Sequence, residues 1–261
     1  GIVYKDLLIL GSEVSELYGA EPGYIRAYNI ESGKLEWTFH TVPWPGELGY
    51  ETWPKDAWKY VGGVNDWGGM SSDEERGMVF LALGSPSYDY YGADRKGENL
   101  FGNCVVALDA RTGRYIWHYQ TVHHDLWDYD LPAPPNLVTL ERDGKKLDAV
   151  AQTSKTGFLY VLDRETGEPL FPIEERKVPA SNIPGEETWP TQPYPIKPLP
   201  YARQFLSEED LSHYSQTSYD SLLKKFKSLR YEGMFTPPDT RGALMFPGSR
   251  GGSSWGRGAL D

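Results

Sequence analysis

The sequence has little cysteine, a deficit of basic residues and no long hydrophobic run. Its one cysteine, Cys104, excludes an internal disulfide bond and a zinc site built from cysteines. No apolar run approaches the roughly 18 residues of a membrane-spanning helix. Lys and Arg number 26 against 37 Asp and Glu, so the formal charge of −11 disfavours nucleic acid or an anionic membrane as the main partner. Such a surface suits a small neutral ligand or a basic protein.

Both ends of the sequence resemble parts of strands. Gly1 leads directly into the run IVYKDLLIL, and the last residues, GALD, again have a strand-like pattern. No start methionine or signal peptide precedes the first strand, so targeting is not readable from the sequence. We therefore expect residues 1–261 to be a fragment of one longer β domain.

The abundant residue types point to an all-β protein. Aromatic residues make up 14% of the 261 residues, and there are 28 glycines and 20 prolines. Aromatic side chains favour strands, whereas glycine and proline favour turns. This composition predicts many short strands joined by tight turns.

Three segments repeat one pattern, at residues 27–37, 107–117 and 161–171. Each has a small or aliphatic residue first, Asp or Asn two positions later, Gly six positions later and a large aromatic residue ten positions later. Gly33, Gly113 and Gly167 allow the positive φ that a tight turn needs, so each segment is predicted to be a β-hairpin.

The hairpins recur at spacings of 80 and 54 residues, which are too uneven for a solenoid. A β-propeller tolerates long loops between its strands, because its blades pack only through their faces. We therefore predict a partial β-propeller of about three to four blades. An open arc of blades leaves strand edges exposed, which again favours a fragment of a closed ring.

Residues 172–242 interrupt the repeat and are predicted to be an insertion within the propeller. Residues 172–200 are too rich in proline for regular structure, and we expect an extended, partly polyproline loop on the surface. Two helices are expected to follow it, with Ser207 and Ser218 as their N-caps.

The run HHDLWDYD, at residues 123–130, gathers three carboxylates, two imidazoles and two large rings. It is either a solvated loop anchored by aromatic residues, or a site in which a carboxylate beside a Trp acts as general base, because desolvation raises its pKa. Adjacent histidines rarely point at one ion, which disfavours His123 and His124 as metal ligands. Cys104 lies in an alternating strand and is expected to be a buried apolar residue.

Three further positions carry candidate chemistry. Lys155 precedes a strongly apolar strand and is either solvated or placed at the central channel, where propeller function gathers. Trp67 lies among glycines and is either packing between blades or a platform for a planar ligand. Glu13 and Glu16 follow a buried strand as surface charges or as ligands of a hard cation.

Taken in order, these motifs resemble a known family. GSEVSEL, VGGVNDWGGMSSDEERGMVF, LALGSP, HHDLWDYDLPAPPNL and SKTGFLYVLDRETG are similar to segments of the pyrroloquinoline quinone (PQQ) dependent dehydrogenases, or quinoproteins. The resemblance covers nearly the whole chain and is greatest to the glucose dehydrogenase-like branch. It implies an eight-bladed propeller, of which this chain would hold part.

The resemblance also implies roles for individual residues. Asp128 would be the base that takes the substrate hydroxyl proton, and Lys155 would stabilise negative charge on the quinone oxygen. Trp67 would stack under the planar PQQ ring. Glu16 falls where the alcohol dehydrogenase members place a metal-binding carboxylate. Trp255 would belong to the share of the site that the next blade supplies.

The implied metal site departs from the family at one position. Ser85 stands where alcohol dehydrogenase members have an asparagine ligand, so coordination would rely more on Glu16, PQQ and Asp128. Asp130 adds a carboxylate that marks lanthanide use in some members, whereas glucose dehydrogenase-like members use calcium or magnesium. The resemblance favours Ca²⁺ or Mg²⁺ and leaves a lanthanide open.

The implied activity is oxidation of a sugar, polyol or other alcohol hydroxyl to a carbonyl, with hydride transfer to PQQ. Electrons would pass to ubiquinone or a c-type cytochrome, which must be separate because the chain has no CxxCH haem motif. The family implies a periplasmic location, with attachment to the inner membrane through a segment outside this chain. A small-alcohol dehydrogenase and a non-catalytic propeller scaffold of the bacterial envelope are the alternatives.

Overall fold

The computed structural model describes residues 1–256, 258 and 259. Within these residues the chain forms thirteen strands in four antiparallel sheets, three short 3₁₀ helices and one α-helix. None of these helices has the length and hydropathy needed to cross a bilayer. The all-β prediction is confirmed.

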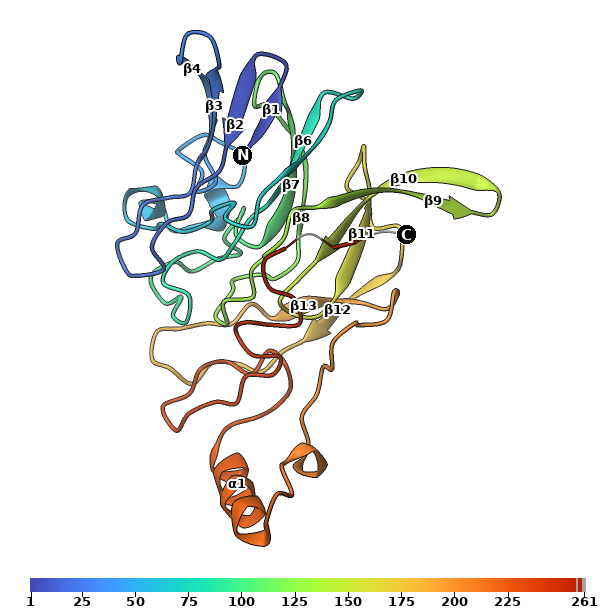
Figure 1. Ribbon diagram of the computed structural model, residues 1–261. Coiled ribbons are helices and arrows are strands. Elements are labelled where there is room, and N and C mark those ends of the chain that lie inside the picture. The colour runs from blue at the N-terminus through green and yellow to red at the C-terminus, as the bar shows by residue number, and fades with distance from the viewer. Residues whose placement is uncertain (257, 260–261) are drawn as a thin grey trace.

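Three of the sheets are propeller blades in which the strands follow one another in chain order (Figure 1). The first blade contains β1 (Ile2–Tyr4), β2 (Leu7–Leu10), β3 (Ile25–Asn29) and β4 (Leu35–Phe39). The second contains β5 (Ser71–Asp73), β6 (Met78–Ala82), β7 (Cys104–Asp109) and β8 (Tyr115–Gln120). The third contains β9 (Asn136–Arg142), β10 (Lys145–Thr153) and β11 (Leu159–Asp163). The first strands of neighbouring blades touch, because β5 contacts both β1 and β9.

Two of the three predicted hairpins are complete. Ala27 pairs with Trp37 in β3–β4, and Ala107 pairs with Trp117 in β7–β8. The third hairpin, at residues 161–171, forms its turn but not its second strand, which is reduced to a single bridge between Leu162 and Pro169. Proline has no N–H to donate to a β-ladder, which accounts for the short pairing.

The repeated Trp and Gly positions meet between neighbouring blades. A Cβ atom placed on Gly113 would lie 2.5 Å from the ring of Trp37, and one on Gly167 would lie 2.6 Å from the ring of Trp117. Each tryptophan therefore packs on the hairpin turn of the next blade, at a distance that only glycine permits. This contact explains why the Gly and the aromatic residue recur together in the sequence.

The core lies between the blades. Ile9, Ile25 and Leu81 are fully buried between the first and second blades, and Phe80 and Val150 are fully buried between the second and third. Burial of each such side chain contributes about 1.5–3 kcal/mol. Cys104 belongs to this core, and burial raises the pKa of its thiol, as the prediction of a buried apolar residue requires.

The prediction that residues 172–200 lack regular structure is wrong. Strands β12 (Ile173–Lys177) and β13 (Thr191–Pro195) form a two-stranded sheet in this segment. Both strands are sheet edges, so Pro193 and Pro195 sit where a missing N–H is tolerated.

The helices that follow differ in one detail from the expectation. The 3₁₀ helix η3 (Glu208–Asp210) begins after Ser207, as predicted. The helix α1 (Gln216–Ser228) is capped by Ser215, whose Oγ accepts from the Ser218 N–H at 3.1 Å, so Ser218 is not the N-cap. Helix α1 buries none of its residues and projects beyond the sheets (Figure 1). The shorter helices η1 (Tyr50–Thr52) and η2 (Ala57–Lys59) lie between β4 and β5.

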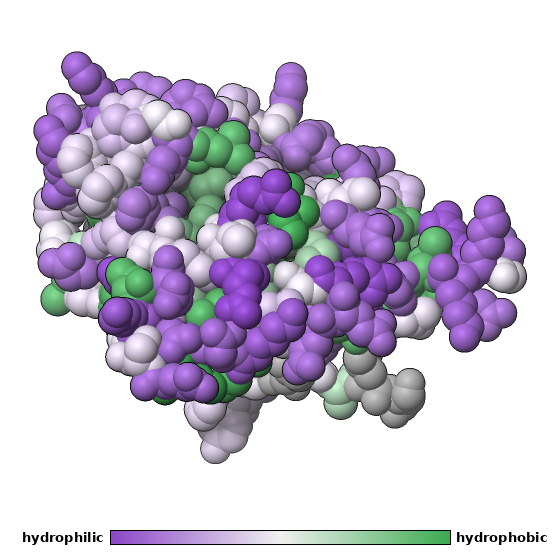
Figure 2. All heavy atoms as spheres, turned by 90° about the horizontal axis from the view of Figure 1, so that it is seen from above, coloured by the Kyte–Doolittle hydropathy of each residue, from purple (hydrophilic) through white to green (hydrophobic). Residues whose placement is uncertain are grey.

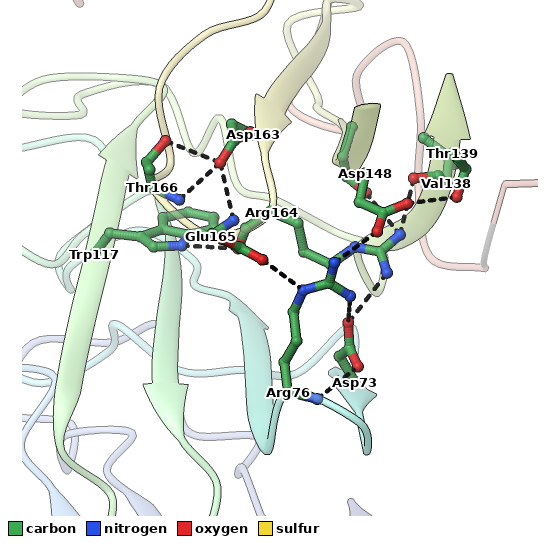
Figure 3. A network of polar contacts seen from close by, with 11 residues as sticks. Asp73, Arg76, Trp117, Val138, Thr139, Asp148, Asp163, Arg164, Glu165 and Thr166 are labelled. Carbon is green, nitrogen blue, oxygen red and sulfur yellow. Dashed lines mark hydrogen bonds and ion pairs between the residues drawn. The ribbon is translucent and has the colours of Figure 1, made fainter. Parts of the chain in front are cut away.

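The two ends of the blades differ in character. Short turns join β1 to β2, β3 to β4, β5 to β6, β7 to β8 and β9 to β10 on one side, whereas the connections on the other side are mostly longer. On the turn side, Arg76 binds Asp73, Asp148 and Glu165, and Arg164 also binds Asp73, so ion pairs join the second and third blades (Figure 3).

The molecule seen from above in Figure 2 is covered mainly by hydrophilic residues, with hydrophobic ones in small separate groups.

Candidate functional site

The long loops between the blade strands meet around a cavity of about 630 Å³. They are the long connections β2–β3, β4–β5, β6–β7 and β8–β9, together with the five-residue connection β10–β11, and they leave the antiparallel sheets on one side because alternate connections share an edge. All the site residues predicted from the sequence line this cavity: Glu16, Trp67, Ser85, Asp128, Asp130 and Lys155.

Lys155 is the centre of the polar contacts in the cavity. Its Nζ donates to Asp128 Oδ1 and to Asp130 Oδ2, each at 2.8 Å, and all three side chains are buried. Trp67 Nε1 donates to Asp130 Oδ2 at 3.2 Å, and the Ser85 N–H donates to Asp130 Oδ1 at 2.6 Å. Four different loops thus bring these five residues into one network.

The aromatic residues of LWDYD fix its carboxylates in place. Trp127 and Tyr129 are fully buried and alternate with Asp128 and Asp130. Trp127 Nε1 donates to the Thr236 carbonyl at 2.7 Å, and the Tyr129 hydroxyl donates to the Pro247 carbonyl at 2.7 Å. The rings therefore anchor the loop while the carboxylates face the cavity.

The backbone at Asp128 is left-handed, with φ of 57°. A non-glycine residue adopts this region at some cost, although Asp tolerates it better than most residues. Such conformations cluster at functional sites, where the surrounding structure holds them.

The three charged groups have unequal protonation. Burial and the neighbouring Asp130 raise the pKa of Asp128. Burial alone works to raise the pKa of Asp130, but the Lys155 ammonium outweighs it and the net shift is downward. Burial also opposes the charge of Lys155, yet the two carboxylates raise its pKa overall. Lys155 and Asp130 therefore form the stable ion pair, and Asp128 is the carboxylate that binds a proton more readily.

Two residues that the sequence did not single out support this network. The Ser85 hydroxyl donates to the Asp125 carboxylate, and Asn103 Nδ2 donates to both, at 3.1 and 3.0 Å. Asp125 also accepts from the N–H groups of Trp127 and Tyr129, at 2.9 and 2.7 Å. Asp125 thus fixes the loop that carries Asp128. Its place in HHDLWDYD was a signal, but sequence alone did not separate it from its neighbours.

Asp89 is a third residue that the sequence did not reveal. It lines the cavity and is 5% exposed. Burial, followed by Asp130, Glu16 and Asp125, raises its pKa to about 8. The cavity lining holds five acidic residues and two basic ones, so it favours a bound cation.

The predicted metal ligands share the cavity wall, but they are not drawn together. Glu16 is exposed there and stands outside the Lys155 network, and the Ser85 hydroxyl is engaged by Asp125 and Asn103. Within the described part of the chain, no three His, Cys, Asp or Glu side chains converge as a metal centre. The available donors are carboxylate and hydroxyl oxygens, the ligand types that Ca²⁺ prefers.

Of the remaining candidate residues, two line the cavity and two do not. Glu13 and Trp255 line the same cavity, and Trp255 is 80% exposed. His123 contacts Gln120, Glu98 and Glu175, whereas His124 Nδ1 lies 2.8 Å from the Gly97 carbonyl. The two imidazoles therefore face different groups and lie outside the cavity lining.

Comparison with known proteins decides the family. Residues 1–261 match the PQQ family model described as "Glucose/ethanol/alcohol dehydrogenase, beta-propeller domain". The chain belongs to the PQQ-dependent dehydrogenase family. The resemblance inferred from the motifs and the partial propeller are both confirmed.

Individual members of the family show the extent of the similarity. The chain is 40% identical to the quinate/shikimate dehydrogenase (quinone) of Acinetobacter baylyi, over 97% of this chain and 32% of that protein. It is 35% identical to the quinoprotein glucose dehydrogenase of Escherichia coli, over 100% of this chain and 32% of that protein. The quinohemoprotein alcohol dehydrogenase of Comamonas testosteroni is similar in structure, with a TM-score of 0.60, 30% identity and coverage of 75% of this chain and 30% of that one. The chain thus spans about a third of the length of these relatives.

The residues of this PQQ-family chain fit the cofactor. Trp67 presents an indole to the cavity, and the Lys155 ammonium lies 5.7 Å from the centre of that ring. A planar, anionic quinone suits an aromatic surface beside a fixed positive charge. The excess of acidic residues around it suits a cation bound together with the quinone.

Proposed function

We propose that this chain forms part of an enzyme that uses PQQ to oxidise a hydroxyl group of a sugar, polyol or other alcohol to a carbonyl. The observation that carries the proposal is the buried Lys155, held between Asp128 and Asp130 beside Trp67. Burying three charged groups is costly, and a non-catalytic scaffold gains nothing from it. The family membership of the chain supports the same reading.

Asp128 is assigned the role of general base. It is the carboxylate of the network that binds a proton most readily, and it faces the cavity. A base that removes the hydroxyl proton makes transfer of hydride from the adjacent carbon easier. The Lys155 ammonium 2.8 Å away favours the ionised form of Asp128 and so opposes burial and Asp130, which together raise its pKa.

Lys155 and Trp67 are assigned to the cofactor. PQQ supplies the two-electron acceptor when it is bound. Lys155 provides a fixed positive charge where an oxygen becomes negative, and Asp130 orients it through the 2.8 Å contact. Trp67, whose Nε1 donates to Asp130, is held so that its ring remains available to a planar group.

A Ca²⁺ ion is proposed as the second cofactor, with Mg²⁺ or a lanthanide as alternatives. Glu16, Ser85, Asp128 and Asp130 are the residues that would hold it, because each places an oxygen on the wall of the cavity. The ion would add positive charge beside the cofactor and would lower the repulsion among the surrounding carboxylates.

The remaining parts of the proposal concern substrate, acceptor and location. The names of the relatives include quinate, shikimate and glucose, which makes these the first substrates to assay. A quinone or a c-type cytochrome is proposed as the electron acceptor, and the periplasm as the location.

The test uses the complete protein that contains this chain. It is loaded with PQQ and Ca²⁺, and reduction of a soluble dye is followed with quinate, shikimate, glucose and ethanol. Turnover with one of these alcohols supports the proposal. If the protein neither binds PQQ nor reduces the dye with any of them, the enzyme is excluded and the scaffold alternative remains.

A further inference from the structure

A second cavity, of about 630 Å³, lies next to the cofactor cavity, and five of its eleven lining residues are Tyr or Trp. It lies between the β2–β3 loop and the loop that contains η2. We call it the aromatic groove and define it by Tyr18, Tyr24, Trp44, Trp58 and Tyr60. Three of these rings are strongly exposed, with Tyr18 at 66%, Trp44 at 42% and Tyr60 at 40%. Such a group of large rings at the surface marks a binding site more often than chance exposure.

The rings of the groove are held through their polar atoms. The Tyr18 hydroxyl donates to the Asp94 carboxylate, and the Tyr60 hydroxyl donates to the Asp94 carbonyl at 2.8 Å. Trp44 Nε1 donates to the Tyr24 hydroxyl at 2.8 Å. Because these polar atoms of Tyr18, Trp44 and Tyr60 are occupied within the protein, their ring faces are what they offer to a ligand. Rings fixed in advance lose little entropy when a ligand stacks on them.

Stacking contacts extend the platform. The ring of His40 lies parallel to Trp44, with centroids 4.4 Å apart and an angle of 9°. Trp44 and Trp58 have centroids 5.3 Å apart. Lys59 is ion-paired with Asp56 at 2.7 Å and lies over the Trp58 ring, so its charge is compensated. Glu21 is the other charged residue of the lining, so the groove disfavours an anion and suits a flat, neutral ligand.

Only a thin wall separates the groove from the cofactor cavity. Glu16 and Gly63 line the cofactor cavity, whereas Tyr18 and Val61 line the groove. The wall consists of residues 17–22 and 61–63, which pair through the Gly63 N–H and the Glu21 carbonyl at 3.2 Å. A Cβ on Gly62 would lie 2.0 Å from the Ala20 carbonyl oxygen, so the two segments pack directly on each other.

We propose that the aromatic groove binds the planar ring of a neutral quinone that accepts electrons from the reduced cofactor. This inference rests on the proposed function, because it concerns the second half of that reaction. Two electrons and two protons leave the reduced cofactor and reduce the quinone to its hydroquinone, and the cofactor returns to its oxidised form. The groove meets the two requirements for such an acceptor, a flat aromatic surface and a position next to the cofactor cavity.

The test compares two acceptors in the complete protein loaded with PQQ and Ca²⁺. One acceptor is duroquinone, a soluble planar quinone, and the other is ferricyanide, an anion without a ring to stack. Trp44→Ala removes a stacking surface, and we expect it to raise the KM for duroquinone about tenfold. The rate with ferricyanide should stay the same. Tyr18→Ala is a second variant at an exposed position, and Tyr18→Phe, which keeps the ring, should restore most of the affinity.

Tyr214→Ala is the matched control, because Tyr214 is 93% exposed and lies outside the groove. An unchanged KM for duroquinone in both Trp44→Ala and Tyr18→Ala overturns the groove and leaves the proposed function standing. If the wild type fails to reduce ferricyanide with any alcohol, the proposed function fails instead. Calorimetric titration with duroquinone then tests the groove without turnover. Loss of duroquinone binding in Trp44→Ala and Tyr18→Ala supports a quinone site, and unchanged binding excludes it.

Discussion

The Nζ of Lys155 lies 2.8 Å from Asp128 Oδ1, inside a cavity whose lining is acidic overall. The two residues are 27 positions apart and come from different loops. Their contact couples the group assigned to proton transfer with the group assigned to the cofactor. Substitution of Asp128 and substitution of Lys155 should therefore have different, measurable effects.

Asp128→Asn should abolish most of the activity without loss of the fold. An amide keeps the shape of the side chain but has no basic oxygen, so turnover should fall about 100-fold to 10,000-fold. PQQ binding should change little, because Lys155 keeps its contact with Asp130. The measurement is dye reduction by the loaded protein, together with the absorbance of bound PQQ. Asp143→Asn, at an exposed position, is the control. Near wild-type turnover in Asp128→Asn would remove Asp128 from the mechanism.

Lys155→Met should destabilise the protein. It leaves the buried carboxylates of Asp128 and Asp130 without their shared cation, a change that typically costs about 3–5 kcal/mol. The decrease in the free energy of unfolding should be smaller at acidic pH, because protonated carboxyl groups are neutral and do not need the lysine charge. Urea unfolding at neutral and acidic pH measures the difference, and Lys145→Met, at an exposed position, is the control. Equal losses at both pH values would argue against an electrostatic cause.

Asp66 should make stability depend on pH. Burial raises its pKa to about 7 from 3.8, so the folded protein binds this proton more tightly than the unfolded chain. The stability that this proton provides is complete below a pH of about 4 and decreases toward a pH of about 7, by at most about 1.4 kcal/mol per pH unit. Urea unfolding of wild type and Asp66→Asn across this range measures the effect. The free energy of unfolding of Asp66→Asn should rise relative to that of the wild type as pH increases from about 4 to about 7. A difference that stays constant over this range would refute the raised pKa of Asp66.

Gly113→Ala should disrupt the contact between the first two blades. Gly113 has φ of 70°, and a Cβ there would lie 2.5 Å from the Trp37 ring. Gly33 has nearly the same φ, 68°, but nothing lies within 4 Å of its position. Gly33→Ala should therefore cost only about 1–2 kcal/mol of backbone strain. Gly113→Ala should cost about 1–3 kcal/mol more because of the clash. Thermal and urea unfolding of both variants give the difference, and equal costs would mean that the tryptophan moves aside freely.

Arg76→Ala should weaken the ion pairs between the second and third blades (Figure 3). Arg76 joins Asp73, Asp148 and Glu165, and Asp73 is 7% exposed in this network. Removal of a hydrogen-bonded partner from a buried charge costs about 1.5–3 kcal/mol. Arg111→Ala, which breaks a pair with both partners largely exposed, should cost no more than about 1 kcal/mol. Unfolding in low and high salt separates the two, since only the exposed pair is strongly screened.

The sequence was a good guide where a residue type has one structural use. The Gly of each repeat predicted a turn, and the turns at Gly33, Gly113 and Gly167 all form with positive φ. The proline count misled for residues 172–200, because the prolines occupy an edge position that composition does not reveal. Ser218 was predicted as an N-cap, but Ser215 is equally suited by residue type and lies where the helix begins.

The site shows the same limit. Asp128, Lys155 and Trp67 were predicted through their motifs, and the structure places them together. Asp125, Asn103 and Asp89 were not, because their importance depends on contacts between loops 18 or more residues apart. Burial of Asp89 in particular is a property of the assembled cavity and leaves no pattern along the chain.

The loops that surround the cavity and the turns that join the blades lie at opposite ends of the strands. Residues that set the fit between blades, such as Trp37 and Gly113, are therefore separate from those that line the cavity. Insertions or substitutions in a loop alter the cavity without changing how one blade meets the next. The lining of the cavity can therefore change in the loops while the sheets keep the sequence that folds them.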